Sequence, residues 1–318
     1  MQLARIEPEL LVIYDHSEFN LYQINASLQR YFPELKHKAV LGSVTDRAHL
    51  KSVMTCDQPS VVFHAAAYKH VPLLEGQALV AVNNNIVGTK NVAELALEAK
   101  VERFVLISTD KAVNPTNVMG ATKRVAEILC QNLGAQSEQT SFITVRFGNV
   151  LDSAGSVVPL FREQIKEGGP VTVTHPEVTR FFMTIPEACR LIMKAATVGA
   201  GGEIYVLDMG AAIKISYLAE QMIKLSGLEV GSDIKIKYVG LRAGEKLHEE
   251  LFHEQEQLLG TGYEKLFLAQ VRSYQKVAWD KNMLDLLAAN NARDVDQVIA
   301  YLKVLVPEFV SVPVEYKA

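Results

Sequence analysis

The sequence predicts an α/β protein built on a doubly wound parallel sheet, with a smaller lobe in its C-terminal half. In the first 110 residues, apolar runs of strand length alternate with segments of helical periodicity, which is typical of parallel strands joined by right-handed crossovers. The apolar run Phe104–Ile107 ends in Ser108-Thr109-Asp110-Lys111. Because open α/β sheets bind ligands at the carboxyl ends of their strands, these polar groups mark the expected site.

The strand and helix units can be followed along the chain. Leu10–Tyr14 predicts a buried strand, and Ser17 suits the cap of a helix that continues to about Tyr31. Two further strand–helix units follow at residues 39–53 and 60–99, and a helix opens near Gly120. Later segments predict strands at 170–174 and 203–207, and helices at 155–166, 215–226 and, as a pair, 279–305.

Composition excludes several classes of protein. The 318 residues are 49% hydrophobic and carry a net charge of −4, which suits a sizeable core and favours neither nucleic acid nor an anionic membrane as a partner. Cys56, Cys130 and Cys189 lack metal-ligand spacing and suit the reduced thiols of a cytoplasmic protein. No apolar run reaches the roughly 20 residues that a bilayer requires. We therefore expect no metal site and no membrane span in this chain.

The dinucleotide-binding version of this sheet begins with a strand, a glycine-rich turn and a helix that holds the pyrophosphate. Here the first glycine is Gly42, and Met1–Arg5 resembles the end of an amphipathic helix. An acidic residue closes the second strand about 20 residues after the glycines; with Asp15 in that role, the glycines would precede Met1. We expect a Rossmann-like sheet without its first strand and glycine loop.

This organisation predicts three regions. Residues 1–150 are expected to form an NAD-binding Rossmann-like domain, and residues 151–255 a substrate-binding lobe with segments that return to the sheet. Residues 256–318 are expected to form a helical extension that packs on the core or on a neighbouring subunit.

Several ordered motifs resemble the extended short-chain dehydrogenase/reductases, and more closely the nucleotide-sugar 4,6-dehydratases of polysaccharide and glycan biosynthesis. The motifs are residues 15–18, 64–72, 108–111, 146–151 and 240–246. The resemblance spans roughly residues 3 to 255 and is specific because the motifs are numerous and in order. Longer members carry transmembrane helices before the catalytic domain, so the resemblance implies either a cytoplasmic protein or the cytoplasmic domain of an inner-membrane protein.

The resemblance implies dehydration of UDP-N-acetylglucosamine to a UDP-4-keto-6-deoxy-N-acetylhexosamine. Hydride leaves sugar C4, water is eliminated across C5 and C6, and the hydride returns to C6. Asp110 is expected to act as the acid toward the C6 hydroxyl, Lys111 as the base at C5, and Thr109 as a relay for the C4 proton. Burial is expected to favour neutral Asp110 and Lys111, because desolvation disfavours charge. Alternatively, the two form a structural ion pair.

Met119 and Lys123 occupy the positions of the superfamily's Tyr-x-x-x-Lys pair. A thioether cannot act as a base, and a methionine here resembles the long, membrane-associated dehydratases. Lys123 is expected to bind the nicotinamide ribose. The alternatives are that Met119 is ordinary helix packing in a site that has lost activity, and that Lys123 is a solvated helix lysine.

The cofactor is expected to be NAD. Asp15 would accept hydrogen bonds from the adenosine ribose, and its charge would repel the 2′-phosphate of NADP. The residues expected beside adenine and the central riboses are Ser43, Val44, Ala65, Ala66 and Ala67.

The substrate is expected to be a UDP-N-acetylhexosamine. The resemblance implies that Asn149 contacts its diphosphate. Arg180 and Arg242 are candidates for the same group, since guanidinium groups bind phosphate in bidentate fashion, and Lys69 is a further candidate for substrate binding. A homo-oligomer is expected by resemblance. Two other functions remain open: a UDP-sugar 4-epimerase or reductase, and a truncated, non-catalytic sugar-nucleotide binding protein.

Overall fold

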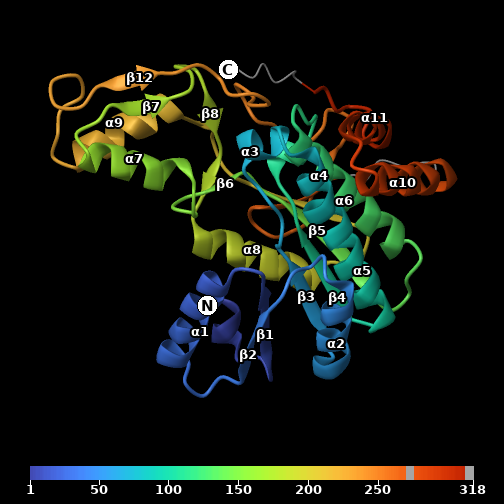
Figure 1. Cartoon of the computed structure of the whole chain (residues 1–318). Helices are drawn as coiled ribbons and strands as arrows, with labels where there is room; N and C mark the ends of the chain where they lie inside the picture. The colour runs from blue at the N-terminus through green and yellow to red at the C-terminus, as the bar shows by residue number, and fades with distance from the viewer. Residues whose placement is uncertain (270–275, 312–318) are drawn as a thin grey trace.

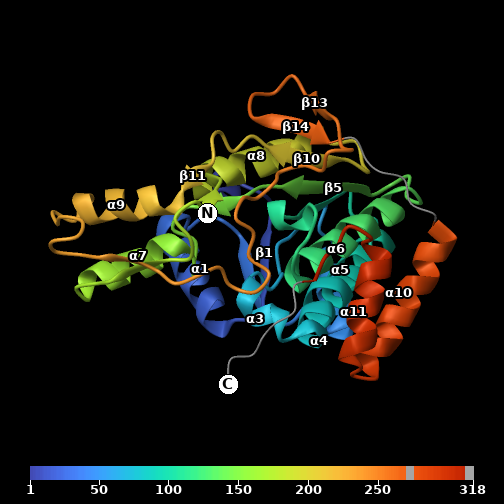
Figure 2. The same cartoon turned by 90° about the horizontal axis from the view of Figure 1, so that it is seen from above.

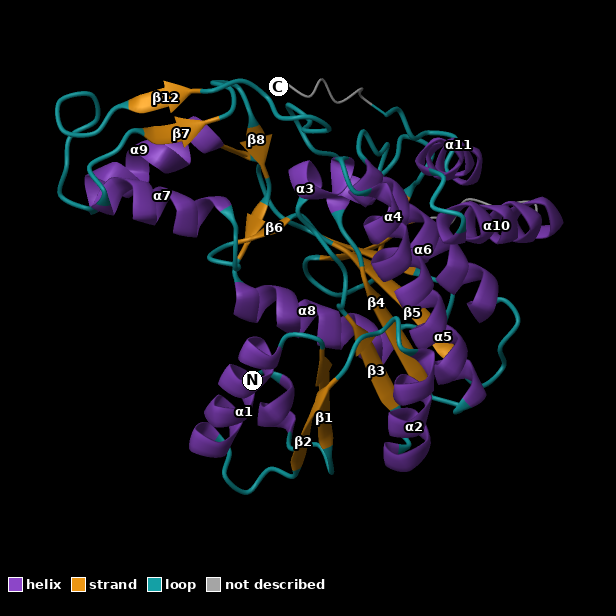
Figure 3. Cartoon of the chain, viewed as in Figure 1, coloured by secondary structure: helices purple, strands orange, loops and turns teal. Residues whose placement is uncertain are grey.

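The computed structural model describes residues 1–269 and 276–311 and confirms the Rossmann-like α/β core (Figures 1 and 3). Its main sheet has the strand order β13-β14-β10-β5-β4-β3. The four strands from β10 to β3 are parallel neighbours, and β14 and β13 extend the sheet in antiparallel fashion. Its strands are β3 (Val61–His64), β4 (Arg103–Ile107), β5 (Ser141–Arg146), β10 (Ile204–Leu207), β13 (Leu258–Gly260) and β14 (Leu266–Ala269).

A separate parallel pair consists of β1 (Leu11–Asp15) and β2 (His37–Leu41). Among the described residues, no ladder of hydrogen bonds joins this pair to the main sheet. In the doubly wound order 3-2-1-4-5-6, the first strand links the second strand to the fourth. The division therefore agrees with the expected sheet that lacks its first strand.

Helices cover both faces of the main sheet, with α8 on one face and α5 and α6 on the other (Figure 2). They are η1 (Leu3–Ile6), α1 (Glu18–Tyr31), α2 (Arg47–Asp57), α3 (Val71–Glu75), α4 (Ala78–Ala81), η2 (Val82–Val87), α5 (Gly88–Glu98), η3 (Asp110–Ala112), α6 (Val118–Gly134), α7 (Val157–Lys166), α8 (Ile185–Val198), α9 (Ile215–Leu225), α10 (Lys276–Asn291) and α11 (Val295–Leu305). Within the described part of the chain, none of these is long and apolar enough to cross a membrane.

Several helix ends follow from local sequence. The Ser17 hydroxyl accepts a hydrogen bond from the Asn20 amide, which confirms the predicted cap of α1. Helix α6 begins at Val118, two residues before the predicted start, because the Asn117 side chain accepts the amide of Gly120. The predicted long helix over residues 78–99 is a continuous run in which η2 is a single π-helical segment.

The asparagines of η2 have the structural hydrogen bonds that their unfavourable helix propensity suggests. The Asn85 carboxamide accepts the Tyr68 amide at 2.8 Å and donates to the Tyr68 carbonyl at 3.1 Å. It also donates to the Thr122 hydroxyl at 3.0 Å. This side chain therefore fixes the segment after β3 to helix α6.

Segments within residues 157–182 and 215–247 pack around a second apolar cluster. Phe161 and Ile165 of α7 pack with Ile215 and Ile223 of α9. The strands here are β6 (Asn149–Val150), β7 (Val171–Val173), β8 (Thr179–Arg180), β9 (Phe182–Met183), β11 (Ile213–Lys214) and β12 (Ile236–Tyr238). The pairs β6–β9, β7–β12 and β8–β11 form small separate sheets. The division into domains at residues 150 and 255 stays a prediction.

The C-terminal region differs from the wholly helical extension that the sequence predicted. Its first described elements are β13 and β14, which complete the edge of the main sheet. Helices α10 and α11 confirm the predicted pair, and they pack outside α4 and α6 (Figure 2). Trp279 and Leu286 of α10 are buried in a cluster that also contains Met119 of α6. Residues 270–275 and 312–318 of this predicted extension lie outside the described residues.

Candidate active site

The end of strand β4 places the central polar groups. Phe104, Val105 and Leu106 are fully buried, and pairing with β3 and β5 fixes the strand from both sides. After Ile107 the chain turns into η3, where the Asp110 amide donates to the carbonyl of Phe147 at 3.1 Å. Thr109, Asp110 and Lys111 therefore lie at the carboxyl edge of the sheet, as predicted.

Asp110 is the centre of these contacts. Its Oδ1 accepts the Thr109 hydroxyl at 2.8 Å and the Lys111 ammonium at 3.0 Å. Lys111 Nζ also donates to Oδ1 of Asn149 at 3.2 Å. The Asp110 side chain is fully buried, and its Oδ2 has no hydrogen-bond partner in the described structure. A carboxylate and an amine are thus in direct contact at the predicted position.

The charge state of Lys111 corrects one expectation. Burial lowers the pKa of Lys111, but the carboxylates of Asp110 and Glu249 outweigh burial and leave the pKa above its ordinary value. Burial does favour the neutral amine, but the expectation that Lys111 is neutral is wrong for this arrangement, because the two acidic neighbours stabilise the ammonium form.

Helix α6 carries the remaining pair. Lys123 is buried, and its Nζ donates to the carbonyl of Ile107 at 2.6 Å. Burial lowers the pKa of Lys123 to about 8, although Glu127 raises it. Met119 is 3% exposed and belongs to the apolar cluster shared with α10 and α11. Lys123 thus lies beside the end of β4, whereas the Met119 side chain packs in the core.

Gly120 allows α6 to approach η3. A Cβ atom built on Gly120 would collide with the carbonyl oxygen of Lys111 and lie 3.1 Å from Cβ of Pro115. Only a residue without a side chain fits this contact. Gly120 therefore sets the distance between α6 and the pair formed by Asp110 and Lys111, called here the acid–amine pair.

The predicted cofactor residues lie along the ends of β1, β2 and β3. Asp15 ends β1, and its Oδ1 accepts the Ser17 amide at 2.7 Å. The Ser43 carbonyl accepts the Tyr14 hydroxyl at 3.0 Å, while Val44 is buried. The alanines follow β3: Ala65 is exposed, and Ala66 and Ala67 are half-buried. Their roles toward a cofactor stay predictions.

The predicted substrate residues are divided between the acid–amine pair and the protein surface. Asn149 contacts Lys111 directly. Lys69 donates to the carbonyl of Ala154 at 2.8 Å, and burial and the charge of Lys111 lower its pKa. Arg242 is exposed. These positions leave their contacts with a substrate as predictions.

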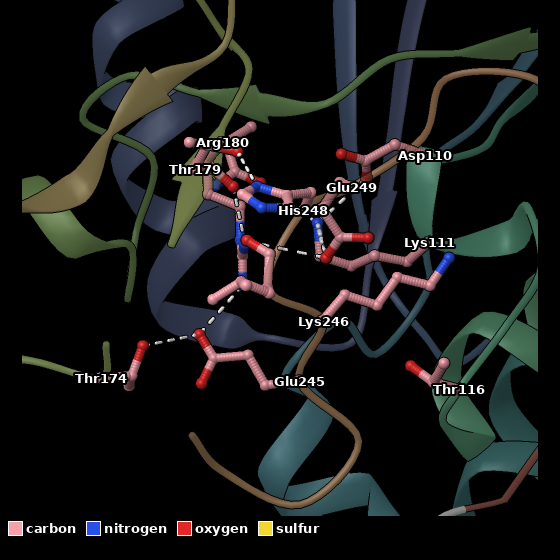
Figure 4. A network of polar contacts seen from close by, with 12 residues as sticks. Asp110, Lys111, Thr116, Thr174, Thr179, Arg180, Glu245, Lys246, His248 and Glu249 are labelled. Carbon is pink, nitrogen blue, oxygen red and sulfur yellow. Dashed lines mark hydrogen bonds and ion pairs between the residues drawn. The ribbon is translucent and has the colours of Figure 1, made fainter. Parts of the chain in front are cut away.

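Arg180 has protein partners on both terminal nitrogens. Nη1 donates to the carbonyls of Thr179 at 2.7 Å and Leu247 at 3.3 Å, and Nη2 donates to Oε1 of Glu245 at 2.9 Å (Figure 4). A diphosphate would have to displace these partners. In this arrangement Arg180 instead links β8 to the loop of residues 240–250.

That loop contains two acidic residues that sequence reasoning did not select. Glu245 follows the turn at residues 243–244 and accepts a hydrogen bond from Arg180. Glu249 is buried, with Oε1 3.8 Å from Lys111 Nζ and 3.9 Å from Arg180 Nε. The available signal was the run of charged residues that follows Gly244 in the sequence.

Within residues 1–269 and 276–311, no cluster of three His, Cys, Asp or Glu side chains is suited to a metal ion.

A family model described as "Polysaccharide biosynthesis protein" matches residues 1–271. The chain belongs to this family. This confirms the resemblance to the extended short-chain dehydrogenase/reductases that process nucleotide sugars. The X-ray structure of Pen from Bacillus thuringiensis has a TM-score of 0.77 and 35% identity, over 86% of this chain and 82% of that chain.

The relatives of this chain have names that describe different activities. The capsular polysaccharide biosynthesis protein CapD of Staphylococcus aureus is 49% identical over 90% of this chain, which spans 48% of CapD. A UDP-N-acetylglucosamine 4,6-dehydratase (inverting) of Campylobacter jejuni is 32% identical over 83% of this chain and 76% of its own length. A UDP-glucose 4-epimerase of Rickettsia canadensis is 40% identical over 61% of this chain and 56% of its own length. The chain thus spans about half of CapD.

Proposed function

We propose that this chain carries the proton-handling residues of an NAD-dependent UDP-N-acetylglucosamine 4,6-dehydratase that serves polysaccharide biosynthesis. The observation that carries the proposal is the hydrogen bond of 3.0 Å between Lys111 Nζ and Asp110 Oδ1 at the carboxyl end of β4. Elimination of water across two carbons needs a base at one and an acid at the other, and adjacent side chains can serve both. The 32% identical dehydratase supports this choice of reaction.

The observed ionic pair can reach the reactive state by one proton transfer. If the proton moves along the hydrogen bond from Lys111 Nζ to Asp110 Oδ1, it leaves a neutral amine and a carboxylic acid with no change in total charge. Lys111 can then remove the C5 proton, while Asp110 protonates the departing C6 hydroxyl. Thr109, which donates to the same carboxylate oxygen, can pass the proton of the C4 hydroxyl to solvent. When the hydride returns to C6, Lys111 gives its proton back to C5, and the Asp110–Lys111 pair regains one proton from solvent.

Some residues of the chain fit NAD. Asp15 stands at the end of β1, where a ribose-binding carboxylate is expected, and Lys123 is held beside the end of β4 by the Ile107 carbonyl. When bound, NAD would supply the acceptor and donor of the hydride. The glycine-rich turn for its pyrophosphate is not part of this chain, whose first glycine is Gly42. Affinity for NAD is therefore the first quantity to measure.

The experiment compares four variants of this chain with UDP-N-acetylglucosamine and NAD in D₂O. D110N and K111M should abolish the NMR signals of the 4-keto-6-deoxy product. D57N and K38M are matched controls, since Lys38 and Asp57 form a Lys–Asp pair at 2.9–3.0 Å elsewhere on the protein; they should leave the rate unchanged. Dehydration at parental rates by D110N and K111M would disprove the proton roles.

The epimerase relative favours a second candidate, 4-epimerisation of a UDP-sugar. The same NMR assay separates the reactions, because dehydration puts solvent deuterium at C5 and removes the C6 oxygen, whereas epimerisation inverts C4 and keeps that oxygen. A titration with NAD tests the non-catalytic alternative. If the protein binds NAD but leaves the sugar nucleotide unchanged, both enzymatic proposals are contradicted.

A further inference from the structure

The loop of residues 240–250 is tied to two parts of the candidate site. On one side, the Thr179 amide donates to the Leu247 carbonyl at 3.1 Å, next to the contacts of Arg180 with the same loop. On the other side, Lys246 Nζ donates to the Val113 carbonyl at 2.9 Å, and the Thr116 hydroxyl donates to the Gly244 carbonyl at 3.0 Å. The loop is therefore held against both β8 and the segment that follows η3.

These ties bring Glu249 to Lys111 from a distant part of the sequence (Figure 4). The Glu249 side chain is 4% exposed, and its Oε1 lies between Lys111 Nζ and Arg180 Nε, at 3.8 and 3.9 Å. Both distances exceed that of a direct hydrogen bond, and Oε2 has no hydrogen-bond partner within the described structure. Glu249 thus acts on Lys111 through its charge at close range.

We infer that Glu249 is a positioning residue that holds the Lys111 ammonium between two carboxylates and sets the pH range in which Lys111 can act as a base. The inference rests on the proposed function, in which Lys111 is that base. With Asp110 alone, the ammonium would have a single acidic neighbour. With Glu249 at 3.8 Å as well, Nζ is attracted by two carboxylates while it donates to Asn149.

The charged groups around Lys111 support this role. Asp110 and Glu249 favour its protonated form, whereas Arg180 and Lys69 oppose it. Burial raises the pKa of Glu249, and the nearby Asp110 raises it further, although Lys111, Arg180 and Lys246 lower it. Two buried carboxylates therefore share one ammonium, and the loss of either changes how readily Lys111 releases its proton.

The experiment measures the titration of Lys111 in E249Q. NMR of protein labelled with ¹³C at lysine Cε reports the titration, and the spectrum of K111R assigns the signal. Loss of the carboxylate should lower the Lys111 titration midpoint by about one pH unit or more. The rising limb of the dehydration rate against pH should move to lower pH by the same amount, with the KM for UDP-N-acetylglucosamine unchanged.

Two further variants separate charge from shape. Glu250 is the next residue in the same loop, and its carboxylate accepts hydrogen bonds from Asn114 and Lys246. E250Q is therefore the matched control and should leave the Lys111 titration midpoint unchanged. E249D keeps the negative charge, so its Lys111 titration midpoint should stay close to that of the parent. An E249Q midpoint equal to that of the parent would overturn the inference, as would an equal shift in E250Q. Because the titration needs no turnover, absence of dehydration would disprove the proposed function without deciding the role of Glu249.

Discussion

Glu127 of α6 accepts two hydrogen bonds of 2.7 Å from Arg146 of β5, one from Nε and one from Nη2, and neither side chain is exposed. The same carboxylate accepts the Ser108 hydroxyl at 2.6 Å and Arg124 Nη1 at 2.7 Å. Arg146 in turn donates to Glu256, in the loop before β13, at 2.6 Å. This network joins the end of β4, the helix of Lys123 and the C-terminal edge of the sheet.

E127A should destabilise the protein by about 3–5 kcal/mol, because it leaves two buried guanidinium groups without their shared carboxylate. Urea unfolding followed by circular dichroism measures the loss. The matched control is E94A, which removes the carboxylate of a partly exposed ion pair with Arg47 and should cost less than about 1 kcal/mol. Equal losses for the two variants would contradict the importance of the buried network.

The stabilisation by Glu127 should depend on pH. Burial raises the pKa of Glu127, but Arg146, Arg124 and the Ser108 hydroxyl outweigh burial and lower it to about 2. Because the folded pKa lies below the ordinary value of 4.5, the unfolded chain binds more protons between these values. The stabilising contribution is complete above pH 4.5 and is lost as the pH falls toward 2. The difference in unfolding free energy between parent and E127Q should therefore narrow over this range, whereas a constant difference would contradict the shift.

G120A should reduce both stability and dehydration, because the new methyl group meets the backbone carbonyl of Lys111. Overpacking of this kind costs about 1–3 kcal/mol, and relief of the clash would move the acid–amine pair. G88A is the matched control in a helix, since its Cβ would meet a methyl group of the Val44 side chain rather than a backbone carbonyl. Thermal unfolding and product formation measure the two effects. A G120A protein as active as G88A would show that the approach of α6 to η3 is not required.

L286A should destabilise the protein by about 2–5 kcal/mol, because Leu286 is fully buried between α10 and the core. L284A on the same helix is the control: Leu284 is 66% exposed, and its loss should change stability by less than about 0.5 kcal/mol. Trp279, the single tryptophan of the chain, lies buried in the same cluster. Its fluorescence reports whether α10 stays packed, and an emission spectrum shifted to longer wavelength in L284A but not in L286A would contradict this packing.

Sequence reasoning predicted the elements that a local sequence pattern encodes. The apolar run 104–107 and the cap at Ser17 are local signals, and both elements form as expected. Strands β13 and β14 were missed because Leu258–Gly260 and Leu266–Ala269 are short, and only the edge of the existing sheet makes them strands.

The candidate site was predicted only in part, for the same physical reason. Thr109, Asp110 and Lys111 adjoin in sequence, so a single strand end places all three. Glu249 reaches Lys111 only through the tertiary contacts of Arg180 and Lys246, which no periodic pattern encodes. The raised pKa of Lys111 could not be predicted for that reason, since one of its two acidic neighbours was unknown.

The separate β1–β2 ladder has a consequence for how the protein unfolds. Its backbone amides are paired only within residues 11–41, so they can open to solvent while β4 and β5 keep their bonds. Local openings of this kind appear as distinct groups in amide hydrogen exchange. The half of the molecule that carries Asp15 should therefore exchange its protons sooner than the half that carries Asp110, and a ligand that touches both would bring their exchange rates together.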